Sequence, residues 1–112
     1  LKNPKTLTAL FQYSVKNGTP SDEELYAISE NIAEGWKLLG RRLNITEPEL
    51  VKFHKTHEEY TEKPYQMLLY WKRREGEKQP TNATYLVLHD ALCHPFVARK
   101  DLAEKICCPL QN

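Results

Sequence analysis

Apolar residues recur at helical spacing along most of the chain, and polar residues that start or stop helices separate the segments. Ser-Asp-Glu-Glu at 21–24 and Thr-Glu-Pro-Glu at 46–49 both have the form of a capping box. In a capping box the hydroxyl residue and the glutamate three positions later satisfy each other's backbone N–H groups. The two boxes predict helices that start at Asp22 and Glu47, the second reaching about His54.

Two further helical segments are predicted in the first half of the chain. Asn and Pro at positions 3 and 4 offer an N-cap and a first helical residue, and apolar side chains then share one face up to Lys16. This pattern predicts an amphipathic helix from about Pro4 to Lys16. Gly35 is expected to bend the chain before a short helix that carries Trp36 and Leu39 inward.

The second half has three segments with helical spacing. Thr61 is expected to cap a long helix that ends near Gly76, and helices over about 83–93 and 98–107 follow, separated by His-Pro at 94–95. No stretch alternates long enough to predict a strand. The residues expected to be buried in one helical core are Trp36, Leu39, Leu43, Leu50, Leu68, Trp71, Leu88 and Leu92.

Composition narrows the class of protein. With 112 residues, of which 40% are hydrophobic and 28% charged, the chain suits one globular domain. A net charge of +1 gives no overall field for nucleic acid or an anionic membrane, and no apolar run is long enough to span a bilayer. Three clustered cysteines are too few for a disulfide scaffold, so we expect a reducing, cytoplasmic location.

The sequence offers no chemistry that would make an enzyme. It lacks a glycine-rich phosphate loop and a nucleophile elbow, and its acidic residues at helix starts are explained by the helix dipole. We therefore expect no catalytic residue, no cofactor and no metal. The spacing of the possible metal ligands matches no known motif; these are His89, Cys93, His94, Cys107 and Cys108.

An ordered series of anchor residues runs from about Ser21 to Cys108. The anchors are Trp36 to Leu43, Tyr65 to Trp71, Gly76, Ala83-Thr84, Leu88, Ala91-Leu92 and Asp101 to Glu104. Through this series the chain resembles the death domain family, and the domains of the Fas-associated adaptor, the receptor-interacting kinases and the ankyrins are similar. The resemblance implies an all-α fold of six antiparallel helices in a Greek-key arrangement, which binds other death domains through asymmetric contacts.

This resemblance sets the expected domain organisation. Residues 1–20 form an N-terminal amphipathic helix and linker, residues 21–108 the death domain, and residues 109–112 a tail. Two features depart from the family pattern. The segment 1–20 lies ahead of the usual first helix, and the stretch between Gly76 and Ala83 is longer than usual, so an extended loop is expected there.

Charged residues of opposite sign are the candidate partner-binding residues. They have two interpretations: solvated faces with cations at a helix C-terminus, or a positive patch that meets an acidic patch on a neighbouring copy. The candidate cations are Lys37, Arg41, Arg42, Lys72, Arg73 and Arg74. The candidate acids are Glu47, Glu49, Glu58, Glu59 and Glu62. Leu69, Leu86 and Phe96 fall off the core stripes and are candidate apolar contacts.

The primary hypothesis is an interaction module of a signalling adaptor or receptor tail, which recruits other death domains in apoptotic or innate-immune signalling. It expects no small-molecule substrate, no nucleic acid and no membrane insertion. One alternative is a structural or autoregulatory domain of a larger, ankyrin-like protein. A second is a helical nucleic-acid-binding domain, which Glu75 and Glu77 oppose because they interrupt the basic run.

Overall fold

The computed structural model describes residues 15–79 and 81–109, and in these residues the chain is all helical, with no strand. A single turn of 3-10 helix, η1 (Ala33–Gly35), joins the first two α-helices. The α-helices are α2 (Asp22–Asn31), α3 (Trp36–Arg42), α4 (Glu47–Thr56), α5 (Glu62–Lys78), α6 (Tyr85–Cys93) and α7 (Lys100–Cys107). The predicted all-α class is thereby confirmed.

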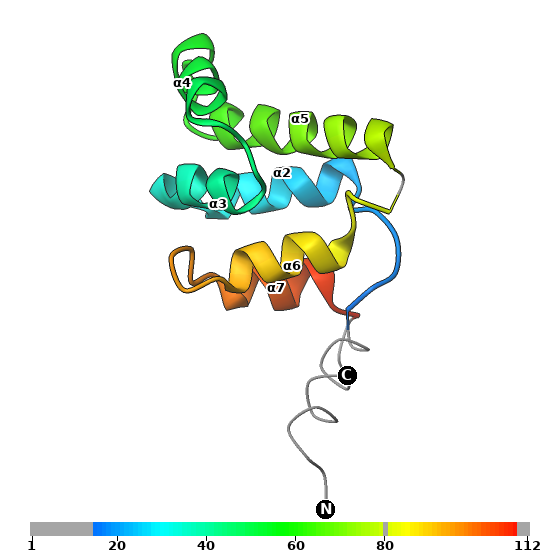
Figure 1. Ribbon diagram of the computed structural model, residues 1–112. Coiled ribbons are helices and arrows are strands. Elements are labelled where there is room, and N and C mark those ends of the chain that lie inside the picture. The colour runs from blue at the N-terminus through cyan, green and yellow to red at the C-terminus, as the bar shows by residue number, and fades with distance from the viewer. Residues whose placement is uncertain (1–14, 80, 110–112) are drawn as a thin grey trace, which may run out of the picture.

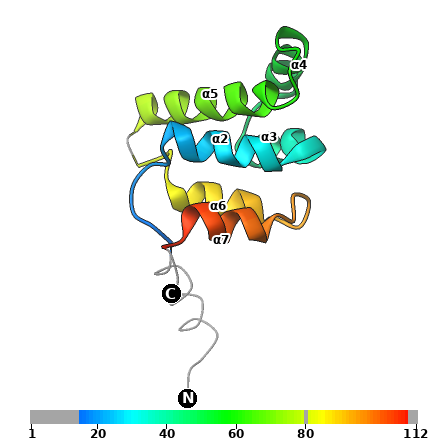
Figure 2. The same ribbon diagram turned by 180° about the vertical axis from the view of Figure 1, so that it is seen from behind.

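The helices form three layers, which Figures 1 and 2 show from opposite sides. The layer of α2 and α3 lies between α5 on one side and the pair α6 and α7 on the other. Neighbours run antiparallel: α2 packs along α5, and α6 packs along α7. The expected antiparallel six-helix bundle is therefore present. Most of the helix predicted over 4–16 lies outside the described residues, and Val15 and Lys16 are not helical.

Both capping boxes form as the sequence predicts. The Ser21 hydroxyl accepts a hydrogen bond from the Glu24 N–H at 3.1 Å, and the Glu24 carboxylate accepts one from the Ser21 N–H at 2.9 Å. Thr46 and Glu49 make the same exchange at 3.3 and 2.8 Å. These bonds satisfy donors that a helix start leaves free, so α2 and α4 begin where expected.

Several other helix boundaries differ from the prediction. Thr61 lies at the start of α5 but its side chain caps nothing, because its own backbone is already helical. Helix α5 continues past Gly76 to Lys78, and α4 continues past His54 to Thr56. Helix α6 begins at Tyr85, two residues after the predicted start, because the Thr84 hydroxyl caps it by accepting from the Val87 N–H at 3.3 Å.

The last helix also starts later than predicted. Ala98 was expected as its first residue, but Ala98 has a φ of +53°, in the left-handed region that a right-handed helix does not use. Arg99 is not helical either, with a φ of −118° and a ψ of 57°, and α7 begins at Lys100. Ala98 and Arg99, which helical spacing had assigned to the last helix, therefore belong to the turn between α6 and α7.

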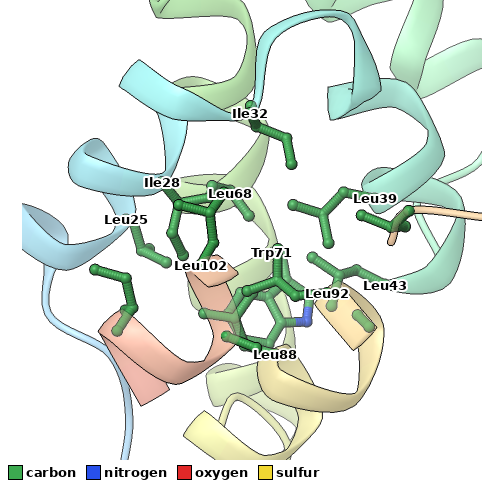
Figure 3. Close-up of a cluster of buried hydrophobic side chains, with 14 of the residues drawn as sticks. Leu25, Ile28, Ile32, Leu39, Leu43, Leu68, Trp71, Leu88, Leu92 and Leu102 are labelled. Carbon is green, nitrogen blue, oxygen red and sulfur yellow. The ribbon is translucent and has the colours of Figure 1, made fainter. Parts of the chain in front are cut away.

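All eight residues predicted to form the core are buried in one hydrophobic cluster. Trp71 of α5 lies in its middle and is 1% exposed. Around its ring are Leu43, which directly follows α3, and Leu88 and Leu92 of α6 (Figure 3). One indole therefore joins three helices from all three layers of the bundle.

Gly40 marks the closest approach of α3 to its neighbours. A Cβ atom at this position would lie 2.6 Å from the Met67 sulfur of α5 and 2.7 Å from a methyl carbon of Leu50 of α4. Such distances are shorter than real van der Waals contacts. A side chain here would therefore require the buried Met67 and Leu50 side chains to move. Gly76 of α5, by contrast, has nothing within 4 Å of the same ideal position.

We predict opposite effects of alanine at these two glycines. Gly40→Ala should lower the free energy of unfolding, because overpacking costs about 1–3 kcal/mol against a gain in helix propensity of about 1 kcal/mol. Gly76→Ala should raise it by up to about 1 kcal/mol, because only the propensity term applies. Urea unfolding of both variants beside the wild type measures the difference. A Gly40→Ala protein as stable as Gly76→Ala would show that α3 does not pack so closely.

Candidate functional site

Two of the candidate interface charges pair with each other inside the chain. Arg41 at the end of α3 and Glu47 at the start of α4 form an ion pair, with Arg41 Nε 2.5 Å from Glu47 Oε1. The hydrogen bond from Arg41 lowers the pKa of Glu47. Both side chains are exposed, so water competes for the pair and a partner protein could displace it.

Arg74 is held by groups of the same chain. Its guanidinium donates to the backbone carbonyls of Leu43 at 3.1 Å and Asn44 at 3.2 Å, which end α3 and lead into α4. It also pairs with Glu75 at 2.8 Å and lies 3.7 Å from Glu49. These contacts tie the connection between α3 and α4 to α5, so Arg74 and Glu49 already have partners within the fold.

Arg42 has a different environment, at the surface where α3 meets the turn between α6 and α7. Its guanidinium carbon lies 5.8 Å from the ring centre of Phe96, which is 67% exposed, and its Nη1 lies 3.2 Å from His94 Nε2. In the described residues Arg42 has no carboxylate partner. We call Arg42, His94 and Phe96 the Arg42 surface.

Arg42 competes with a backbone N–H for the His94 ring. The backbone N–H of Phe96 donates to His94 Nδ1 at 3.1 Å, and Arg42 Nη1 lies 3.2 Å from His94 Nε2. A neutral imidazole accepts at only one of its nitrogens, so the ring satisfies only one of these two donors. An exposed guanidinium beside an exposed aromatic ring, without a carboxylate partner in the described residues, is well suited to bind a carboxylate of a partner.

A second candidate surface is an open groove of about 470 Å³ between the start of α2 and the C-terminal half of α5. It brings together Leu69, Lys72 and Arg73, three of the candidate contact residues. An ion pair crosses it, with Lys72 Nζ 2.8 Å from Asp22 Oδ1. The complete lining is Asp22, Leu69, Lys72, Arg73, Gly76 and Glu77.

The remaining candidates lie apart from these two surfaces. Glu58 and Glu59 are exposed in the loop between α4 and α5, and Glu62 is the first residue of α5. We call these three residues the acidic loop. Leu86 is 39% exposed on α6, in the layer opposite α5 (Figure 1). The structure therefore does not join the three apolar candidates into one patch.

Lys37 belongs to a cluster that the sequence analysis missed. Lys63 of α5 places its Nζ 3.3 Å from His54 Nδ1, and the charges of Lys37 of α3 and Lys55 of α4 also act on His54. The three ammonium groups, with Lys37 as the largest cause, lower the pKa of His54. The lysines come from three helices, so no local sequence motif could have revealed their convergence.

A second polar cluster that was missed holds the linker before α2. The Glu24 carboxylate accepts hydrogen bonds from Lys16 at 2.8 Å, from the Ser21 N–H and from the Tyr85 hydroxyl. The linker is also held at its backbone, because Lys16 N–H donates to Cys107 O at 2.8 Å. Partial burial opposes ionisation of Glu24, but these bonds outweigh it and lower its pKa to about 2.

Reactive chemistry is weak in the described part of the chain. Cys107 is buried, and burial raises the pKa of its thiol to about 12, so it stays protonated and a poor nucleophile. Residues 15–79 and 81–109 contain no group of three or more His, Cys, Asp or Glu side chains that could hold a metal ion. Within the same residues, no helix has both the length and the apolar character to cross a membrane.

Comparison with known proteins gives one positive finding. The family model described as Death domain matches residues 22–107, the stretch that holds α2 to α7. This match covers more than half of the chain. No curated protein and no solved structure gives a match.

The low pKa of Glu24 predicts how stability depends on pH. Glutamate in an unfolded chain has a pKa of about 4.3. The ionised Glu24 therefore stabilises the fold above that pH, and this contribution is lost as the pH falls toward 2. Glu24→Gln keeps a capping side chain but removes the charge. It should be less stable than wild type at pH 7, and the difference should shrink between pH 5 and pH 2.

Denaturant unfolding at several pH values measures this effect. Glu23→Gln is the matched control, because Glu23 is exposed on the same helical turn. If Glu24→Gln and Glu23→Gln followed the same pH profile, the cluster of Lys16, Glu24 and Tyr85 would not contribute to stability.

Proposed function

The chain belongs to the death domain family, whose members are protein–protein interaction modules, and we propose that it recruits other death domains. In this proposal it acts in the cytoplasm as part of a signalling adaptor or receptor tail, in apoptotic or innate-immune signalling. It would work by bringing partners together rather than by chemistry.

The observation that carries the proposal is the Arg42 surface. Its cation has no carboxylate within the described residues and competes with the Phe96 N–H for the His94 ring, so a carboxylate from outside would supply a charged acceptor that the described residues do not. Phe96 adds apolar area beside the charge, and aromatic and arginine side chains are the usual anchors of protein interfaces.

The acidic loop of a second copy is the partner surface that we propose. Glu58 and Glu59 are exposed and form no ion pair within the described residues. The loop joins α4 to α5, whereas the Arg42 surface joins α3 to the turn after α6. Because the two surfaces differ, a contact between them is asymmetric, and repeated contacts can build an open assembly.

The other candidate residues take secondary roles in this proposal. The groove with Leu69, Lys72 and Arg73 is a second contact surface, on which the Lys72 and Asp22 pair can open toward a partner. Arg41 and Glu47 contribute only after their own ion pair is broken. This order of importance follows from which charges already have a partner inside the chain.

Charge reversal at Arg42 tests the proposal. Arg42→Glu should leave the fold intact, because exposed substitutions usually change stability by under about 0.5 kcal/mol. Self-association, measured by sedimentation at low ionic strength, should weaken by more than about tenfold, because like charges then meet across the contact. Mixing this variant with a Glu58→Arg, Glu59→Arg variant should restore part of the binding.

Lys105→Glu is the matched control, since Lys105 is also exposed but lies on α7, away from both surfaces. Its association should match that of the wild type. Unchanged association of Arg42→Glu, or equal losses in both variants, would contradict the proposed contact. A wild-type protein that stays monomeric at every concentration would contradict homotypic assembly.

A further inference from the structure

The lysine cluster around His54 concentrates positive charge where α3, α4 and α5 meet. Lys37, Lys55 and Lys63 come from three different helices, and none of them forms an ion pair in the described part of the chain. Lys63 Nζ is 3.3 Å from His54 Nδ1. Unpaired like charges repel each other, so an anion that binds between them would lower their electrostatic energy.

The buried Trp36 is a common neighbour of two members of the cluster. The His54 ring stacks on Trp36, with ring centres 6.5 Å apart and planes 18° from parallel. Lys37 Nζ lies 5.6 Å from the centre of the same indole. The indole therefore brings the His54 ring and the Lys37 ammonium group to one part of the surface.

The hydrogen bond to His54 also sets which ring nitrogen carries the proton. A lysine ammonium has donors only, so Nδ1 facing Lys63 must be the acceptor, and the neutral ring then bears its proton on Nε2. That N–H is a further donor beside the three ammonium groups. The site thus offers donors of several kinds, and in the described residues no carboxylate forms an ion pair with its lysines.

We propose that Lys37, Lys55, Lys63 and His54 form a binding site for a phosphorylated side chain of a partner protein. The site contains lysines rather than arginines. Arginine matches the planar carboxylate with a two-pronged contact, whereas lysines act as point charges that can surround a rounder phosphate. A phosphate monoester also carries nearly two negative charges and three acceptor oxygens, which suits several converging donors.

A phosphoprotein suits the surroundings better than a membrane surface does. The exposed Glu58 and Glu59 follow Lys55 in the chain and would be repelled by a sheet of anionic headgroups. A single phosphate group needs to approach only the lysines. Lys37 also lowers the pKa of Glu47, but it is the smallest of the causes. The largest is the hydrogen bond that Glu47 accepts from Arg41.

His54 supplies the readout for a direct test. In the free protein the lysine charges, Lys37 first, lower its pKa. A bound dianion would cancel part of this field, so the pKa of His54 should rise on binding. NMR titration of the imidazole signals follows His54, with His57, His89 and His94 as references in the same spectra. The probes are inorganic phosphate, a short phosphoserine peptide and its unphosphorylated twin, each against sodium chloride at equal ionic strength.

We expect phosphate and the phosphopeptide to raise the pKa of His54 more than chloride does, and the unphosphorylated peptide to have no such effect. Lys37→Gln and Lys63→Gln should each weaken phosphopeptide binding by about tenfold, and Lys105→Gln should not. Because all three are surface changes, the dispersion of the amide spectrum can verify that each variant is folded.

Three outcomes would overturn the proposal. These are an equal response to chloride and phosphate, equal binding by Lys37→Gln and Lys105→Gln, or binding to vesicles containing phosphatidylserine without binding to the phosphopeptide. The test does not depend on Arg42 or on self-association. Loss of phosphate binding and loss of death domain recruitment can therefore be told apart.

Discussion

Burial of the Trp71 ring is the constraint on which the rest of the molecule depends. A tryptophan buries about 150–250 Å² of mostly apolar surface, and here that surface joins α5 to α3 and α6 across the bundle. The neighbouring helices are short, and short helices are marginal alone. The capping boxes of α2 and α4 set where those helices begin, but packing around the indole is what keeps the three layers together. The Arg42 surface depends on this packing, because it lies where α3 meets the turn after α6, and both helices pack around the indole.

The parts of the fold that could be predicted from the sequence are those that depend on near neighbours in the chain. A capping box spans only four residues, so the starts of α2 after Ser21 and of α4 after Thr46 were predicted correctly. Boundaries that depend on tertiary structure were predicted wrongly. Nothing local to Ala98 signals a left-handed backbone, since the turn there is held by contacts such as the Arg99 N–H to the Leu92 carbonyl, 2.9 Å.

The same distinction explains what the sequence could say about the candidate site. Helical spacing showed which charges lie off the core stripes, but not which of them find partners inside the chain. Arg74 bonds to a carbonyl 31 residues away, and Arg42 lies beside a histidine 52 residues away. Both arginines look alike in the sequence, yet one is held within the fold and the other faces outward. Binding surfaces of this kind emerge only once distant helices are brought together.

The hydrogen bond from the Lys16 N–H to the Cys107 carbonyl affects how the domain can be joined to neighbouring sequence. It occupies a carbonyl at the end of α7 and holds the entry and exit of the chain side by side, on the side of the bundle away from α4 (Figure 1). A domain with adjacent ends can be inserted into another sequence without forcing the flanking parts apart.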